Sequence, residues 1–260
     1  MDSGAHELVG TPDDPLVEAR SLAEAASAAG IPLRLLGGLA VRVLCPDFPP
    51  RLRRDQDIDF GCLSKGRRQV MSFLEGFGCE PDRRFNALSG DRQMYFTAPS
   101  GRPIDVMVDR LTMCHELDFR SGFTALPLTL GVVDLLLTKL QIVELNEKDA
   151  RDICHLLSAF PVTGESPGEG VPEIDRARFC DVMGGDWGWW RTVTDNLNKL
   201  PLLVADNPDL IPPAPTHDAL RTAERLSELA DATPKSLKWK TRARVGDRMR
   251  WYELPEEVAH

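Results

Sequence analysis

Residues 57–62 read Asp-Ile-Asp-Phe-Gly-Cys, so carboxylates alternate with apolar side chains over the first four positions. A period of two predicts a β-strand that buries one face and turns Asp57 and Asp59 together to the other. Two carboxylates this close repel each other unless a cation joins them. The stretch therefore predicts a strand within a sheet and also a candidate metal site.

A short apolar run, 33–36, precedes this strand and ends in Gly37-Gly38, after which 39–44 carries a helical pattern. This order predicts a strand, a glycine turn and a helix. Glycines before a helix let backbone N–H groups approach a phosphate without interference from a Cβ. An ordinary turn without a ligand is the alternative interpretation.

A third carboxylate, Asp105, lies in the apolar run 104–109, which we expect to pair as a strand with 93–98 through the loop 99–103. A charge in an apolar strand is costly to bury unless it is paired or bound to metal. Asp57, Asp59 and Asp105 together suit two Mg²⁺ ions, with Mn²⁺ as the alternative, and two such ions support nucleotidyl transfer. Solvated loop acids are the competing interpretation.

The remaining pattern is mostly helical. Helices are expected over 16–29, between Ser64 and Gly78, and over 131–145, 149–157, 175–200 and 216–230. The segment 161–172 is rich in Gly, Pro and Glu and is interpreted as a boundary. These elements predict an α/β (α+β) catalytic domain over 1–160 and a helical C-terminal domain over 173–260.

Composition limits the possible functions. The 260 residues are 42% hydrophobic and 27% charged, as in ordinary globular proteins, and the net charge of −9 argues against binding nucleic acid over the whole surface. The six cysteines show no spacing typical of a zinc site or a disulfide framework. No apolar stretch approaches the length of a membrane span, so we expect a cytoplasmic protein without a membrane partner.

Two C-terminal segments each allow two interpretations. The segment 186–191 contains three tryptophans, which could stack a nucleobase or belong to the core. The segment 235–252 is strongly basic and interleaved with aromatic residues, so it could guide an RNA acceptor or dock against the acidic remainder of the chain.

The combined motifs resemble the nucleotidyltransferase superfamily related to DNA polymerase beta. The matching residues are Gly37-Gly38 within Leu35–Ala40, the pair Asp57-Ile58-Asp59, and Asp105 within Pro103–Val106. The resemblance covers roughly the first 160 residues. It implies a mixed sheet flanked by helices, with Asp57 and Asp59 binding both metals and Asp105 completing the site.

Within that superfamily, the segments 134–140 and 148–157 resemble the minimal nucleotidyltransferases of the abortive-infection AbiE type, which are often toxins of toxin–antitoxin pairs. The resemblance implies that Lys139 contacts the nucleotide triphosphate and that Asp152 supports the nucleotide site. It also implies an NTP as substrate, tRNA or another RNA as acceptor, and an antitoxin protein as a partner.

Three functions follow as hypotheses. The first is an AbiE-like enzyme that transfers a nucleoside monophosphate from an NTP to a hydroxyl of a macromolecule. The second is a small-molecule nucleotidyltransferase of the antibiotic-modifying kind, which uses the same carboxylates. The third is a catalytically silent module that keeps the nucleotide pocket for regulation.

Overall fold

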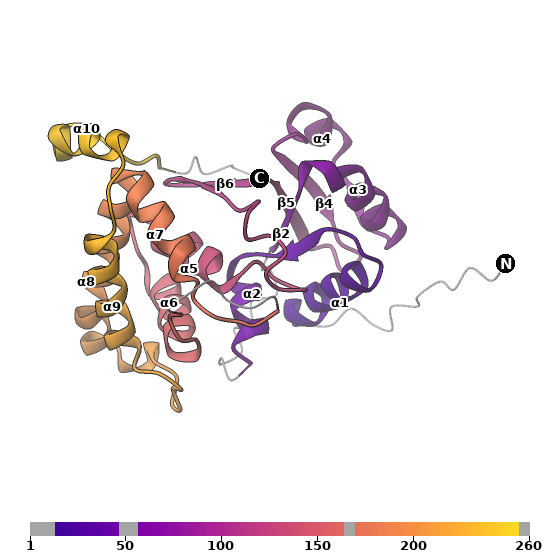
Figure 1. Cartoon of the computed structure of the whole chain (residues 1–260). Coiled ribbons are helices and arrows are strands. Elements are labelled where there is room, and N and C mark those ends of the chain that lie inside the picture. Colours follow the sequence, from indigo (N-terminus) through magenta and orange to yellow (C-terminus); the bar gives the residue numbers. More distant parts are fainter. Residues whose placement is uncertain (1–13, 47–56, 164–169, 255–260) are drawn as a thin grey trace. The chain divides into compact units, whose positions relative to one another are not determined.

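The computed structural model describes residues 14–46, 57–163 and 170–254, which form two compact units. The first unit contains described residues 14–43, 57–110 and 127–130, and the second contains 44–46, 111–126, 131–163 and 170–254. Figure 1 follows the chain by colour from the indigo N-terminal helix to the yellow C-terminal one. The predicted domains, 1–160 and 173–260, stay a prediction.

A five-stranded mixed sheet organises the first unit, in the order β1-β2-β5-β4-β3. Its strands are β1 (Leu33–Leu35), β2 (Ile58–Cys62), β3 (Glu80–Pro81), β4 (Gln93–Thr97) and β5 (Pro103–Val108). The pair β2 and β5 is parallel, and every other neighbouring pair is antiparallel. The predicted mixed sheet with flanking helices is confirmed, as is the hairpin that joins 93–98 to 104–109.

The helices of the first unit are α1 (Pro15–Ala28), α2 (Gly37–Leu44), α3 (Arg67–Gly76) and α4 (Arg83–Ser89), with the 3₁₀ turn η1 (Ser64–Gly66) before α3. Asp14 begins α1 by accepting a hydrogen bond from the Leu16 amide at 2.9 Å. The same carboxylate forms an ion pair with Arg42 of α2 at 2.9 Å. Helix α4 was not expected, although Asp82 caps it through the Phe85 amide.

The two faces of this sheet differ in chemistry. One face is apolar and fully buried, with Ile58, Phe60, Met94, Phe96, Ile104 and Val106 at 0% exposure. Helix α1 is tied to the β4–β5 loop through Glu18, which accepts hydrogen bonds from Ser100 and from Arg102 at 2.8 Å. The other face carries the alternate residues of each strand, which are half-buried and mostly polar. The candidate site lies on this second face.

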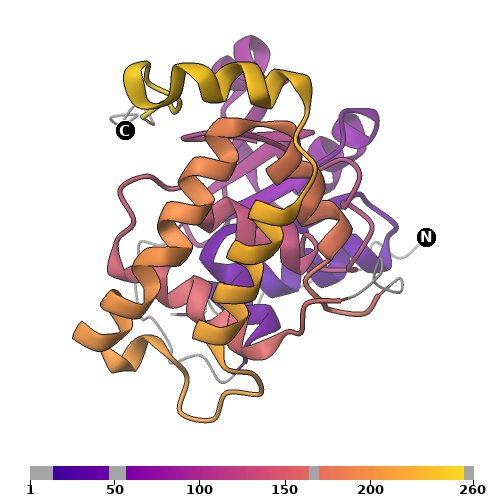
Figure 2. The ribbon, with the colours of Figure 1, turned by 60° about the vertical axis from the view of Figure 1, so that its left-hand side comes forward.

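The second unit is mainly helical and begins with a two-stranded ribbon of β6 (Arg110–Thr112) and β7 (Glu116–Asp118). Its helices are α5 (Val132–Leu140), α6 (Glu147–Ala159), α7 (Arg176–Gly185), α8 (Trp187–Asp206), α9 (Ala219–Ala232) and α10 (Leu237–Val245), with 3₁₀ turns η2 (Pro208–Leu210) and η3 (Gly246–Arg248). Figure 2 shows α8 and α9 side by side and α10 across one end of α8.

Some predicted boundaries were wrong. The helix expected over 131–145 ends at Leu140, and the helix expected over 175–200 divides at Asp186. Asp186 caps α8 by accepting a hydrogen bond from the Gly188 amide at 2.8 Å, so its side chain starts a new helix after Gly184-Gly185. Helix α10 falls in the segment that was interpreted only as basic and aromatic.

Two further observations concern membrane-spanning helices and the cysteine thiols. In the described ranges, no helix combines the length and apolar character needed to cross a bilayer. All six cysteines have free thiols, and five of them are buried. Burial raises the pKa of the Cys62, Cys79 and Cys154 thiols to about 12, so they remain protonated at neutral pH.

Candidate active site

Asp59 and Asp105 lie directly opposite each other on the parallel strands β2 and β5. Side chains in register on neighbouring strands point to the same face, so the two carboxylates stand beside each other on the half-buried face. Two negative charges about 5 Å apart repel by roughly 3 kcal/mol at an effective dielectric constant of about 20. Sequence spacing could not reveal this pairing, because β2 ends at Cys62 and β5 begins only at Pro103.

Gly37 brings the start of α2 against the same carboxylate. Its φ is +61°, and a Cβ on this residue would stand 2.4 Å from Asp59 Oδ2. The Leu36 amide donates to the Asp59 carbonyl at 2.8 Å, which fixes the end of β1 beside β2. The predicted glycine turn and the predicted aspartate pair therefore meet. A side chain at position 37 would be strained by the positive φ and would force the Asp59 carboxylate to shift.

Replacing this glycine should damage the first unit and displace Asp59. We expect Gly37→Ala to lower the free energy of unfolding by about 1–3 kcal/mol, because a left-handed conformation is unfavourable for alanine and the added Cβ collides with Asp59 Oδ2. Gly76→Ala is the matched control, since a Cβ there meets nothing within 4 Å inside α3. Chemical denaturation measures both variants, and equal stability of Gly37→Ala and wild type would contradict the close approach.

Strand β4 adds two polar residues that the sequence interpretation missed. Gln93 donates from Nε2 to Asp105 Oδ1 at 2.5 Å, and Tyr95 lies in register with Asp105. The signal was present in the alternation of Gln93, Tyr95 and Thr97 with the apolar Met94 and Phe96. The alternation alone did not show that β4 pairs with β5, and only this pairing places Gln93 and Tyr95 beside Asp105.

Asp57 contributes charge to this face from just before β2, where its side chain is exposed. Burial raises the pKa of the Tyr95 phenol, and the charges of Asp105 and then Asp57 raise it further. Asp59 and Asp105 therefore share one face of the sheet, and Asp57 lies close enough for its charge to act on Tyr95 of that face. Across the described ranges, no group of three Asp, Glu, His or Cys side chains is already gathered closely enough to enclose a metal ion.

The donor set nevertheless fits Mg²⁺. This ion is commonly held by one or two carboxylates together with water and substrate phosphate oxygens, so an all-protein cage is not required. Asp59 and Asp105 supply such a pair in register on neighbouring strands. Asp57, two residues before Asp59 in the sequence, is a third oxygen donor near this pair.

Lys139 and Asp152 lie in the second unit, where they contact each other. The Lys139 ammonium forms ion pairs with Asp152 at 2.9 Å and Asp149 at 3.1 Å, and its side chain is 10% exposed. Burial alone would lower the pKa of Lys139, yet the charges of Asp152 and Asp149 outweigh it and raise the pKa. These contacts support a structural role in joining α5 to α6, and the role in nucleotide binding stays a prediction.

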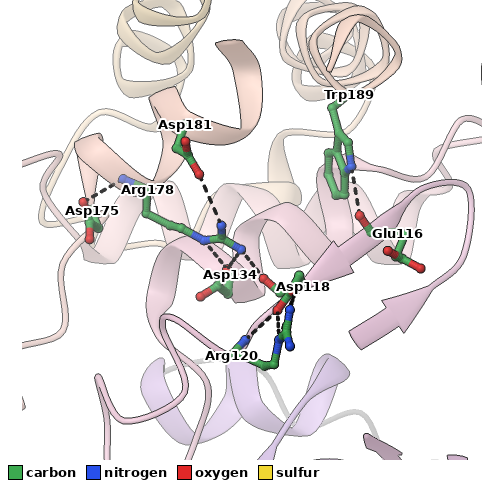
Figure 3. A network of polar contacts seen from close by, with 8 residues as sticks. All are labelled: Glu116, Asp118, Arg120, Asp134, Asp175, Arg178, Asp181 and Trp189. Atoms are coloured by element: carbon green, nitrogen blue, oxygen red, sulfur yellow. Dashed lines mark hydrogen bonds and ion pairs between the residues drawn. The ribbon is translucent and has the colours of Figure 1, made fainter. Parts of the chain in front are cut away.

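A second buried charge pair joins α5 to α7 and β7 (Figure 3). Arg178 of α7 donates to Asp134 Oδ1 of α5 at 3.0 Å and also to the Asp118 carbonyl. Asp134 is fully buried, and burial raises the pKa of its carboxyl group to about 6 although Arg178 opposes the shift. Asp134 Oδ2 packs against Gly122, where a Cβ would stand 2.1 Å away. This network organises the second unit.

Comparisons with known proteins add one finding. No protein-family model matches the chain, and no curated protein matches it. Among solved structures, the chain is similar to an antigenic nucleotidyltransferase-like protein from Paracoccidioides brasiliensis. The sequence identity is 16% and the TM-score is 0.38, over 88% of this chain and 97% of that chain. Inferences about activity therefore rest on the geometry of the side chains.

Proposed function

We propose that the protein is a Mg²⁺-dependent nucleotidyltransferase, which transfers a nucleoside monophosphate from an NTP to an acceptor hydroxyl. The observation that carries the proposal is the register pair of Asp59 and Asp105, with Gly37 packed against the Asp59 carboxylate. Paired carboxylates beside a glycine turn that opens a helix provide sites for a divalent cation and for the phosphates it accompanies.

Each residue has a defined part in this proposal. Asp59 and Asp105 hold the cation, with Asp57 as an additional donor, and Gln93 orients Asp105 by its hydrogen bond. The amides at the start of α2, at Gly37 and Gly38, bind phosphate oxygens. When bound, the divalent cations activate the attacking hydroxyl and stabilise the leaving pyrophosphate. The apolar residues between the carboxylates anchor both strands in the core, which fixes the spacing of the charges.

Gln93 provides a test that leaves the carboxylates intact. We expect Gln93→Ala to weaken metal binding by about 10- to 100-fold, because Asp105 loses the partner that orients it. Binding of Mn²⁺, measured by the loss of its free electron paramagnetic resonance signal, reports the change. Gln69→Ala removes an exposed glutamine of α3 and should leave the affinity unchanged. An unchanged affinity in Gln93→Ala would exclude this orienting role.

The acceptor and the biological role extend the proposal. By resemblance to the AbiE type, we propose RNA, with tRNA first, as the acceptor, and a toxin role with an antitoxin partner. The small-molecule alternative uses the same carboxylates and differs only in the acceptor, and the silent-module alternative requires nucleotide binding without transfer. The register pair of Asp59 and Asp105 beside the glycine turn supports the catalytic proposal, because in-line displacement needs carboxylates that hold divalent cations next to the phosphates.

The deciding experiment incubates the protein with each α-³²P-labelled NTP, Mg²⁺ and a cell extract, and then separates RNA, protein and small molecules. Label in the RNA fraction supports the AbiE-like enzyme, and label in a small molecule supports the antibiotic-modifying kind. Nucleotide binding without label in any fraction supports the silent module and contradicts the enzyme. Growth arrest on expression that disappears in Asp57→Ala is the test of the toxin role.

A further inference from the structure

The basic segment of the second unit is concentrated on α10 and the residues after it. Between Lys235 and Glu253 the chain contains seven Lys or Arg residues and two acidic residues, whereas the whole chain has a net charge of −9. Helix α10 has no buried residue, so its charges are presented to solvent or to a groove within the second unit. The segment is therefore a local positive surface on an acidic protein.

A large groove in the second unit adjoins this surface, with a volume of about 1140 Å³. Its walls are the β6–β7 turn, the start of α8, helix α10 and the segment that follows α10. The Glu253 amide donates to the Cys114 carbonyl at 3.0 Å, which fixes this last segment beside the β6–β7 turn. Trp251 Nε1 donates to Thr192 Oγ1 at 3.0 Å, which holds the segment after α10 against α8.

Two arginines of the groove are held against aromatic rings. The Arg242 guanidinium lies 4.7 Å from the centre of the Trp187 ring, and the Arg250 guanidinium lies 4.8 Å from the centre of the Tyr252 ring. Arg242 also donates to the Gly246 and Met249 carbonyls. Within the part of the chain that the structure describes, neither arginine forms an ion pair with a carboxylate. Their charges are oriented by rings and carbonyls and are not neutralised.

This arrangement matches the chemistry of a single-stranded nucleic acid. A guanidinium donates two parallel hydrogen bonds to a phosphate, and an unpaired base stacks on an aromatic ring. The groove also contains three acidic residues. Asp186 forms an ion pair with Lys238 at 3.0 Å, and Glu116 and Glu253 would repel phosphates but can accept hydrogen bonds from base amino groups. An acidic protein segment could pair with the two arginines, but its carboxylates would not stack on the aromatic rings.

We infer that the groove binds a single-stranded RNA segment, with phosphates on Arg242 and Arg250 and a base stacked on Tyr252. Trp187 and Trp189 are 6% and 5% exposed, so they belong to the core beneath the groove and support it. The inference concerns binding by the second unit, and it holds or fails independently of catalysis at Asp59.

The test is fluorescence anisotropy of a labelled 12-nucleotide single-stranded RNA, without NTP or metal, at several salt concentrations. We expect Arg242→Gln with Arg250→Gln to weaken binding at least about tenfold and to reduce the slope of log K against log salt by about 1.4, since each lost phosphate contact removes about 0.7. The matched control is Arg221→Gln with Arg225→Gln, which removes two exposed charges from α9 and should bind like the wild type.

A second pair of variants tests stacking separately from charge. Tyr252→Ala should weaken binding by about fivefold or more, while Tyr252→Phe, which keeps the ring, should bind like the wild type. The inference is overturned if the full chain does not bind the RNA, or if the α9 control loses as much affinity as the groove variant. It is also overturned if duplex RNA or polyglutamate of equal charge competes as well as unlabelled single-stranded RNA.

Discussion

Asp59→Asn is expected to reduce nucleotidyl transfer by about a hundredfold or more while the protein stays folded. The loss follows from removing one of the two register-paired carboxylates that hold the divalent cation, whose stabilisation of the transition state amounts to several kcal/mol. The protein should stay folded, because asparagine has nearly the size and shape of aspartate and Asp59 is only half-buried. Pyrophosphate release gives the rate, and a thermal melt gives the stability.

The control for this variant is Asp82→Asn. Asp82 is exposed and caps α4, and asparagine caps a helix as well as aspartate does. The control makes the same change of charge in the same unit and should keep full activity. If Asp59→Asn were as active as Asp82→Asn, or if it lost activity only because it melted, Asp59 would not be a metal-binding residue.

The second large effect is expected at Lys139, and it concerns stability. Lys139→Met should lower the free energy of unfolding by about 3–5 kcal/mol, because Asp149 and Asp152 would remain buried without the cation between them. Methionine keeps the length and packing of the side chain, so the lost charge is the main change. Urea denaturation monitored by tryptophan fluorescence measures the difference in the second unit.

Arg151→Met is the matched control on α6. Arg151 pairs with the exposed Glu147 one turn away and also donates to the Asp209 carbonyl at 3.1 Å, and these exposed contacts together should contribute about 1–2 kcal/mol. Adding Asp152→Asn to Lys139→Met should restore part of the stability, because it removes one of the two buried negative charges that Lys139 contacts. A Lys139→Met protein that is as stable as the wild type but fails to bind NTP would instead support the nucleotide-contacting role.

Local features of the fold were predictable from the sequence. The strand predicted over 57–62, the hairpin around 99–103 and the glycine turn before α2 all depend on neighbouring residues, and each is found, with the strand beginning at Ile58. Helix α4 and the break at Asp186 had usable signals, an aspartate at the capping position in each case. At Asp186 the signal was hidden by a helical pattern that continues across it, whereas α4 has no buried residue and so lacks an apolar stripe to mark it.

The sheet pairing and the second unit were not predictable in the same way. The register of Asp59 with Asp105 depends on a parallel pairing between distant segments, which no local pattern specifies. The participation of Gln93 depends on that register. The chain also leaves the first unit at 111 and returns to it for 127–130, where Leu35 hydrogen-bonds to Leu128. This return depends on contacts between residues far apart in the sequence, which a local pattern does not specify.

The most direct test of nucleotidyl transfer at Asp59 and Asp105 is a paired-label reaction. One reaction contains NTP labelled at the α-phosphate, and the other contains the same NTP labelled at the γ-phosphate, each with and without Mg²⁺. We expect the α-label to join the acceptor and the γ-label to leave as pyrophosphate, only with Mg²⁺ and only when Asp59 and Asp105 are present. Transfer of the γ-label, or equal α-transfer by Asp59→Asn and wild type, would contradict the proposed function.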